Sequence, residues 1–323
     1  MKIQTVTGNR YVILPPTLNW ERHRMSYQIS TRIWKILICP QCNGKLTPTT
    51  SGAACAQCQA IYTCNADGAL DLRLQSPKKT SIEFELGTAL ATETVSIAPL
   101  TMNSAPAVDF TNVHVPHHLS RELLSYFPKA SPGSLMLDLG CGRSIHQEVG
   151  EHAGFEWVGI DYNSPQAPFL ADAHSLPFES NSFDFISSIA VLEHIRFPFV
   201  MMREAYRVLK TGGRFLGTVA FLEPFHGDSF YHHSHLGLLN MLRYGGFQVE
   251  RIAPSAQWSG LTAQASMALF PLMPRPLAQA IIRPVEWLHK FWWWAGGLVA
   301  RQSKEITRIR NTTGGFAFIA SKQ

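Results

Sequence analysis

Three aspartates at the ends of successive apolar segments are the residues of this chain most able to bind a ligand. Asp138 lies in the apolar run 135–139, directly before a Gly-Cys-Gly turn at 140–142. Asp161 ends a second apolar segment, and Asp172 follows a third. Because the carboxyl ends of parallel strands meet at one edge of a sheet, these three acids fit a single ligand.

The glycine turn narrows the class of that ligand. Glycines let a ligand approach the backbone, and the free N–H groups of a following helix, which we expect to begin near Ser144, favour negative charge. A dinucleotide fingerprint, G-x-G-x-x-G, would need a third glycine where this chain has Ile145. S-adenosylmethionine fits better, because its amine, its ribose hydroxyls and its adenine amine can each donate to one acid. We assign these contacts to Asp138, Asp161 and Asp172 in that order.

At these residues the chain resembles the class I S-adenosylmethionine-dependent methyltransferases. The segments LDLGCG, VGIDYN, DAHSLPF, SFDFISSIAVLEHI and REAYRVLKTGGRF occur in that family's order and at its usual spacing. The resemblance covers roughly residues 113–322, with 254–311 unmatched. The cofactor-binding candidates are Asp138, Gly140, Cys141, Gly142, Asp161, Tyr162, Asp172 and Ala173.

The resemblance implies an α/β fold with a doubly wound, Rossmann-like sheet of seven strands, the last of them antiparallel. Apolar runs predict these strands at 135–139, 155–163, 169–171, 183–190, 214–221, 246–253 and 315–321. Helices are expected over 119–127, 197–210 and 236–244. The loops at the carboxyl ends of the strands should therefore carry the site.

Candidate catalytic residues follow the fourth and fifth strands. His226 and His235 could act as a base toward a hydroxyl acceptor, and Glu193 is a further candidate. The base-modifying amino methyltransferases of this fold carry a polar-Pro-Pro-aromatic signature where this chain has Ile-Ala-Val at 189–191, which disfavours methylation of an adenine or cytosine amine. Pyrimidine C5 chemistry is also disfavoured, because the only cysteine of this domain, Cys141, lies in the cofactor turn.

Two C-x-x-C pairs near the N-terminus predict a zinc site. Cys39 and Cys42 precede Cys55 and Cys58 by a spacing that lets two tight turns converge on one tetrahedral metal. Residues 36–72 resemble the small zinc-ribbon proteins that activate tRNA and rRNA methyltransferases. The resemblance implies a docking or stabilising role, and since no predicted cofactor ligand comes from the ribbon, we expect the two sites to be independent.

These motifs predict the organisation of the whole chain. The segment before the ribbon lacks the apolar core of a signal peptide, so we expect a cytoplasmic protein. The predicted parts are an N-terminal tail at 1–30, a zinc ribbon at 31–75, a linker with at most one short helix at 76–112 and the methyltransferase domain at 113–323.

A hydrophobic and basic insertion, 254–311, separates the last two predicted strands. The chain has a net charge of +5, and within 275–310 seven Lys and Arg face only Glu286 and Glu305, so this excess accounts for all of it. The aromatic run 291–300 is shorter than the roughly 20 residues that span a bilayer. It is typical of an interfacial helix or a lid over an acceptor. A helical pair packed on the ribbon or in a dimer is an alternative.

Three hypotheses for function follow. The first is O-methylation of a small-molecule, glycan-linked or lipid-linked acceptor, with peripheral contact through 275–310 to the inner face of a membrane. The second is methylation of tRNA or rRNA, with the ribbon and the insertion binding the RNA. The third is a non-catalytic interaction module that keeps the cofactor fold.

Overall fold

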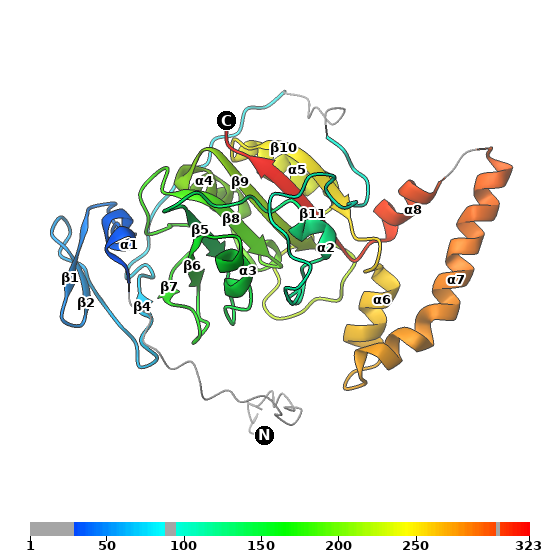
Figure 1. Ribbon diagram of the computed structural model, residues 1–323, viewed down its shortest axis with the longest axis horizontal. Helices are drawn as coiled ribbons and strands as arrows, with labels where there is room; N and C mark the ends of the chain where they lie inside the picture. The colour runs from blue at the N-terminus through cyan, green and yellow to red at the C-terminus, as the bar shows by residue number, and fades with distance from the viewer. Residues whose placement is uncertain (1–28, 88–94, 302–303) are drawn as a thin grey trace, which may run out of the picture.

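The computed structural model describes residues 29–87, 95–301 and 304–323 (Figure 1). All but the last two residues of the predicted tail, 1–30, lie outside the described residues. Figure 1 shows a central sheet flanked by helices, a small unit at one end and a helical arm at the other.

The central sheet contains the seven predicted strands. They are β5 (Leu135–Leu139), β6 (Glu156–Asp161), β7 (Phe169–Leu170), β8 (Phe183–Ile189), β9 (Leu209–Ala220), β10 (Gln248–Pro254) and β11 (Gly315–Ser321). The strand order is β10-β11-β9-β8-β5-β6-β7, and β11 runs antiparallel to both of its neighbours. The doubly wound fold with an antiparallel last strand is confirmed.

Helices cover both faces of this sheet. They are α2 (Arg121–Leu124), α3 (Gln147–His152), α4 (Pro198–Val208) and α5 (His235–Tyr244), and the short 3-10 helix η2 (Leu192–His194) follows β8. The prediction that a helix begins near Ser144 is wrong, because Ser144 has a left-handed φ of 57° and α3 starts at Gln147. Since α2 is also shorter than expected, loops form most of the wall around the carboxyl ends of β5 and β6.

The cysteine-rich unit has its own three-stranded antiparallel sheet. It consists of α1 (Thr31–Ile36), β1 (Leu46–Thr49), β2 (Gly52–Cys55) and β3 (Ile61–Thr63). Its last strand, β4 (Leu70–Asp71), leaves this sheet and pairs in parallel with β7, so it becomes the eighth strand of the central sheet. The unit is therefore joined to the larger one by main-chain hydrogen bonds as well as by the covalent chain.

Further contacts fix this junction. The N–H of Ile38 donates to the carbonyl of Pro177 at 3.0 Å, and the N–H of Glu179 donates to the carbonyl of Ile36 at 2.8 Å. Downstream, the described part of the predicted linker contains no helix, and Ser96 forms a bridge to Arg251 at the other edge of the sheet. Among the described residues of this segment, Lys78 contacts Pro40 and Ser175, and Ser96 lies at the opposite edge of the sheet.

The insertion forms the arm at the far end of Figure 1. It comprises α6 (Gly260–Gln264), the π-helix η3 (Ala265–Leu269), α7 (Arg275–Val299) and α8 (Glu305–Thr312). Pro284 lies inside α7 and removes one backbone hydrogen bond, which favours the bend that Figure 1 shows in this helix. Among the helices that the structure describes, none is long and apolar enough to span a bilayer.

Candidate functional site

A cavity of about 1970 Å³ lies at the carboxyl ends of β5, β6 and β7. Seven of the eight cofactor-binding candidates line it, although they come from three separate segments of the chain. These seven are Gly140, Cys141, Gly142, Asp161, Tyr162, Asp172 and Ala173. The structure therefore brings together almost the whole predicted set.

The glycine turn forms the floor of this cavity. Gly140 has a φ of 79°, and a Cβ at this position would lie 2.4 Å from a methyl carbon of Val191. Gly142 has a φ of 51°, but a Cβ added there would meet nothing within 4 Å. The first glycine is therefore needed for packing, whereas the second leaves free space on the cavity side of the turn.

The carboxylate of Asp161 holds this turn against the loop after β6. One oxygen accepts from the N–H of Gly142 at 3.0 Å, and the other accepts from the N–H groups of Asn163 and Ser164 at 3.0 and 2.9 Å. The hydroxyl of Ser164 donates back to the carbonyl of Gly142 at 2.5 Å. Asp161 thus lines the cavity and also shapes it.

Asp138 is the one cofactor candidate that the described cavity wall does not include. Its side chain is fully buried and accepts from the Ser187 hydroxyl at 2.9 Å and from the Trp157 indole N–H at 3.3 Å. These bonds let Asp138 support the turn from beneath, and its predicted contact with the cofactor amine stays a prediction.

His146 is a wall residue that the sequence interpretation missed. Its Nδ1 lies 3.7 Å from the Asp138 carboxylate, and its ring lines the cavity. Burial alone would lower the pKa of His146, but the Asp138 carboxylate outweighs that effect and raises it. The available signal was its position in the sequence, four residues after Gly142, in the segment that follows the cofactor turn.

Asp172 and His174 form a polar pair at the third strand end. The Nδ1 of His174 contacts the Asp172 carboxylate at 2.6 Å, and its Nε2 accepts from the N–H of Phe197 at 3.1 Å. The ring therefore carries its proton on Nδ1 and donates it to Asp172. Burial acts to raise the pKa of Asp172, but the hydrogen bonds from His174 hold it below its usual value.

The cysteine-rich unit reaches this cavity, which corrects the expectation of two independent sites. Arg73 forms a bidentate ion pair with Asp71 of β4, and its guanidinium lies 5.7 Å from the ring centre of Tyr162. It also contacts the carbonyl of Tyr162 at 3.3 Å. Asn43 and Lys78 line the same cavity. The parallel pairing of β4 with β7 places these residues beside the cofactor-binding loops.

A second cavity of about 480 Å³ adjoins the first, and the two share His118, Ala190 and His226. Its walls combine ionisable groups with an apolar surface. The ionisable residues include His117, Glu193, Glu223 and Arg275, and the apolar ones include Leu100, Val219, Trp258, Met267 and Phe316. A molecule in this cavity would meet a ligand of the first one at the shared residues.

Glu193 and His226 meet at this junction. The Glu193 side chain is 1% exposed, and neither of its oxygens has a hydrogen-bond partner among the described residues. Burial raises the pKa of its carboxyl to about 7. The Nδ1 of His226 lies 3.1 Å from the carbonyl of Pro224, which assigns the ring proton to Nδ1 and leaves a lone pair on Nε2. Side-chain N and O atoms of Glu193, His194 and His226 all lie within 4.8 Å of one another, close enough for their charges to interact.

The other histidines of this region differ in their placement. Desolvation by the surrounding wall, with a smaller contribution from the charge of His117, lowers the pKa of His118, although part of its side chain is exposed. His235 lines neither of the two cavities as the structure describes them. It opens α5, where its ring lies 5.9 Å from that of Phe316 and the charge of Arg310 is near. His235 is therefore not supported as a catalytic candidate.

The comparison with protein families identifies the domain that contains much of the wall of the first cavity. Residues 137–217, which run from β5 into β9, match the methyltransferase domain family. The chain carries a class I methyltransferase domain. The predicted cofactor-binding segments, the glycine turn after β5 and Asp161 at the end of β6, lie within the matched residues, and their contact with a cofactor stays a prediction.

Similar proteins share this methyltransferase domain over part of their length. The demethylmenaquinone methyltransferase of Renibacterium salmoninarum is 32% identical over 109 residues, which cover 30% of this chain and 46% of that protein. The ubiquinone biosynthesis O-methyltransferase of Roseobacter denitrificans is 28% identical over 130 residues, 36% of this chain and 52% of that protein. The chain thus spans about half the length of each.

A solved structure with a partner protein is also similar. It is a complex between the Haloferax volcanii Trm112 methyltransferase activator and a methyltransferase. The sequence identity is 18%, the match covers 63% of this chain and 88% of that chain, and the TM-score is 0.43.

The first prediction concerns the buried carboxyl of the methyltransferase domain. Since the folded pKa of Glu193 is raised to about 7 from 4.5, the stabilising effect of its protonation is complete below 4.5 and is lost as the pH rises through 7. Glu193→Gln does not titrate. It should therefore become more stable than the wild type as the pH rises, by on the order of 3 kcal/mol above the folded pKa. Urea unfolding at several pH values measures this difference.

The control is Glu151→Gln, which changes an exposed glutamate of α3. Its stability relative to the wild type should stay nearly constant over the same pH range. A constant difference for Glu193→Gln as well would show that Glu193 is not buried without partners.

Proposed function

We propose that this protein is an S-adenosylmethionine-dependent methyltransferase that methylates an oxygen of an acceptor bound in the second cavity. The observation that carries the proposal is the junction of the two cavities at His226, directly beside the buried carboxyl of Glu193. The match to the methyltransferase domain family supports the cofactor.

The residues of the first cavity fit this cofactor. Gly142 leaves open space beside the turn, and Asp161 and Asp172 present acceptors at two adjacent strand ends. Tyr162 adds an exposed aromatic ring next to Asp161. When bound, the cofactor supplies an electrophilic methyl group on a sulfonium, so the protein has to align the acceptor and exclude water, which can contribute about 7–11 kcal/mol.

We assign the role of base to His226. Its Nδ1 proton is held by the Pro224 carbonyl, so the free Nε2 can accept the proton of an acceptor hydroxyl. Glu193 lies close enough to stabilise the resulting imidazolium, and above pH of about 7 its carboxyl is ionised and can do so. Such a base contributes about 10²–10⁴-fold to the rate.

The second cavity suggests the chemistry of the acceptor. Trp258 donates its indole N–H to Glu223 at 2.6 Å, which fixes an acidic group beside an aromatic wall. Arg275, His117 and His118 provide donors at another part of the wall. This mixture suits a partly apolar, hydroxyl-bearing molecule with a polar or anionic group, such as a glycan-linked or lipid-linked acceptor.

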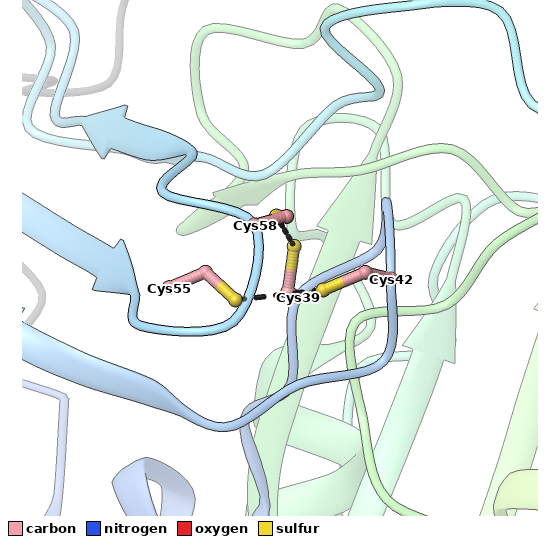
Figure 2. Close-up of side chains that lie close together, drawn as sticks. All are labelled: Cys39, Cys42, Cys55 and Cys58. Atoms are coloured by element: carbon pink, nitrogen blue, oxygen red, sulfur yellow. Dashed lines mark hydrogen bonds between the residues drawn. The ribbon is translucent and has the colours of Figure 1, made fainter.

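We further propose that Cys39, Cys42, Cys55 and Cys58 bind zinc. Their sulfurs lie within 4.8 Å of one another, and those of Cys39 and Cys58 and of Cys42 and Cys55 are 3.6 and 3.5 Å apart (Figure 2). Four thiolates about 2.3 Å from a zinc ion lie about 3.8 Å apart, so the sulfurs need to move little. The ion would hold together a unit whose small sheet buries few apolar side chains.

The first test of the proposed function measures cofactor binding. Gly142→Asn keeps a residue that tolerates a left-handed φ but places a side chain in the space left by the glycine. S-adenosylmethionine should then bind at least about tenfold more weakly, a loss of about 1.4 kcal/mol in calorimetry. Gly212→Asn is the matched control, since Gly212 also has a positive φ and open surroundings but lines neither described cavity. Equal affinity in both variants would contradict the cofactor site.

The second test separates the two candidate histidines. His226→Ala should lower methyl transfer to acceptors in a cell extract by about 100-fold, with the affinity for S-adenosylmethionine unchanged, because a base acts only in the chemical step. His235→Ala should retain most of the activity. Incorporation of labelled methyl groups gives the rate. Equal losses in both variants would remove His226 from the role.

The third test concerns the cysteines. Freshly purified protein should contain one zinc per chain, and Cys58→Ser should lose it, whereas Cys64→Ser should keep it because Cys64 is not part of the cluster. Since Arg73 joins the unit to the loop of Tyr162, loss of zinc should also weaken cofactor binding. Metal analysis and calorimetry on the two variants measure both effects. Full metal content in Cys58→Ser would refute the site.

A further inference from the structure

The longest helix that the structure describes, α7, presents its most apolar side to solvent. The exposed fraction is 71% for Trp287, 74% for Trp292, 60% for Trp294 and 60% for Leu298. Within α7, which the structure describes completely, only Ala278 and Gly297 are buried. A helix that packs on a globular body normally shows the reverse arrangement, with its apolar stripe toward the core.

The polar residues of α7 all lie on the opposite side. At 3.6 residues per turn, they fall within an arc of about 120°. They are Arg275, Gln279, Arg283, Glu286, His289 and Lys290. Glu286 points toward α6, where it accepts from the Thr262 hydroxyl at 2.6 Å and from the Ser259 hydroxyl. The remaining two thirds of the helix surface therefore carries apolar side chains alone.

The charge of the arm indicates what can cover this face. Seven Lys and Arg lie in residues 275–310, and of the two acids there, Glu286 faces inward. Arg283 and Lys290 flank the apolar face along one side. Pairing two copies through α7 would bring two positive arms together, and an RNA would meet Trp and Leu side chains where phosphates need cations. Tryptophans bordered by cations instead match an anionic lipid surface.

We propose that α7 lies on an anionic lipid surface with its apolar face inserted at the interface. The end of η3 and the connection to α7 add two exposed apolar side chains, since Leu269 is 58% and Leu272 is 92% exposed. The helix does not cross the bilayer, in keeping with its composition. The axis of α7 thereby lies parallel to the lipid surface, and the arm attaches the enzyme to that surface.

This placement also bears on the acceptor, a step that rests on the proposed function. Met267 of η3 and Arg275 at the start of α7 belong to the wall of the second cavity. A lipid-bound arm therefore brings this cavity to the lipid surface. The acceptor class that fits is an amphiphile whose hydroxyl-bearing part enters the cavity while its apolar part stays in the lipid.

The experiment uses the full chain and two kinds of vesicle, one of phosphatidylcholine alone and one of an equal mixture with phosphatidylglycerol. The wild type should sediment with the mixed vesicles. Combined replacement of Trp287, Phe291 and Trp292 by Ser should lower its partitioning at least tenfold, and Arg283→Gln and Lys290→Gln should each lower it about fivefold on anionic vesicles only. The control is Ile61→Ser, which changes a side chain that is 62% exposed in β3, at the opposite end of the molecule, and should bind as the wild type does.

The possible outcomes separate the alternatives. Sedimentation with neither kind of vesicle, or an equal loss in the Ile61→Ser control, would overturn the proposal. A dimer in the absence of lipid that the triple variant abolishes would assign the face to a second copy, and salt-sensitive tRNA binding lost in the same variant would assign it to RNA. S-adenosylmethionine binding, measured on all variants, should not change, so failure of lipid binding is distinguishable from failure of the cofactor site.

Discussion

The attachment of the glycine turn to the end of β6 is the constraint on which the rest of the site depends. The N–H groups of Gly140 and Cys141 both donate to the carbonyl of Ile160 at 2.9 Å, and the carboxylate of Asp161 accepts from Gly142. These bonds bind two adjacent strands at their carboxyl ends, where the chain would otherwise diverge. A side chain at Gly140 would collide with Val191, so the turn is also packed against the loop after β8. The same turn therefore supports both the cofactor-binding loops and the loop on the acceptor side of the site.

Two buried acids, Asp138 and Glu193, differ in the hydrogen bonds that their carboxyl groups accept. Asp138 accepts from two hydrogen-bond donors and lies beside a histidine, and it helps to hold the floor of the site. Glu193 is equally buried but has no partner among the described residues, which disfavours its ionised form. An unsatisfied buried carboxyl normally destabilises a protein. Glu193 lies at the junction of two cavities, where a carboxyl with a raised pKa can change its protonation state when a proton moves nearby. Its destabilising effect on the fold is therefore consistent with a role in the reaction.

Much of this arrangement could be predicted from local pattern. The strands β5 to β9 were identifiable because apolar runs followed by turn residues mark buried parallel strands, and the acids Asp161 and Asp172 followed from their position at strand ends. The pairing of Glu193 with His226 could not be predicted, since 33 positions separate them and only the folded loops bring them together. For the same reason Arg73 was missed. The sequence interpretation placed His235 in the loop before the helix, whereas it is the first residue of α5, after the capping residue Ser234.

The two ends of the molecule extend the catalytic unit in different physical ways. At one end, β4 adds a strand to the central sheet, so the cysteine-rich unit is held by directional main-chain hydrogen bonds that tolerate little displacement. At the other end, α7 offers non-directional apolar contact, for which complete burial of one large side chain contributes about 1.5–3 kcal/mol. A few half-inserted tryptophans would therefore contribute as much as several cations worth about 1 kcal/mol each. Because the apolar part does not depend on ionic strength, salt should weaken the attachment of the arm only in part, whereas contacts to phosphates alone would be lost steeply.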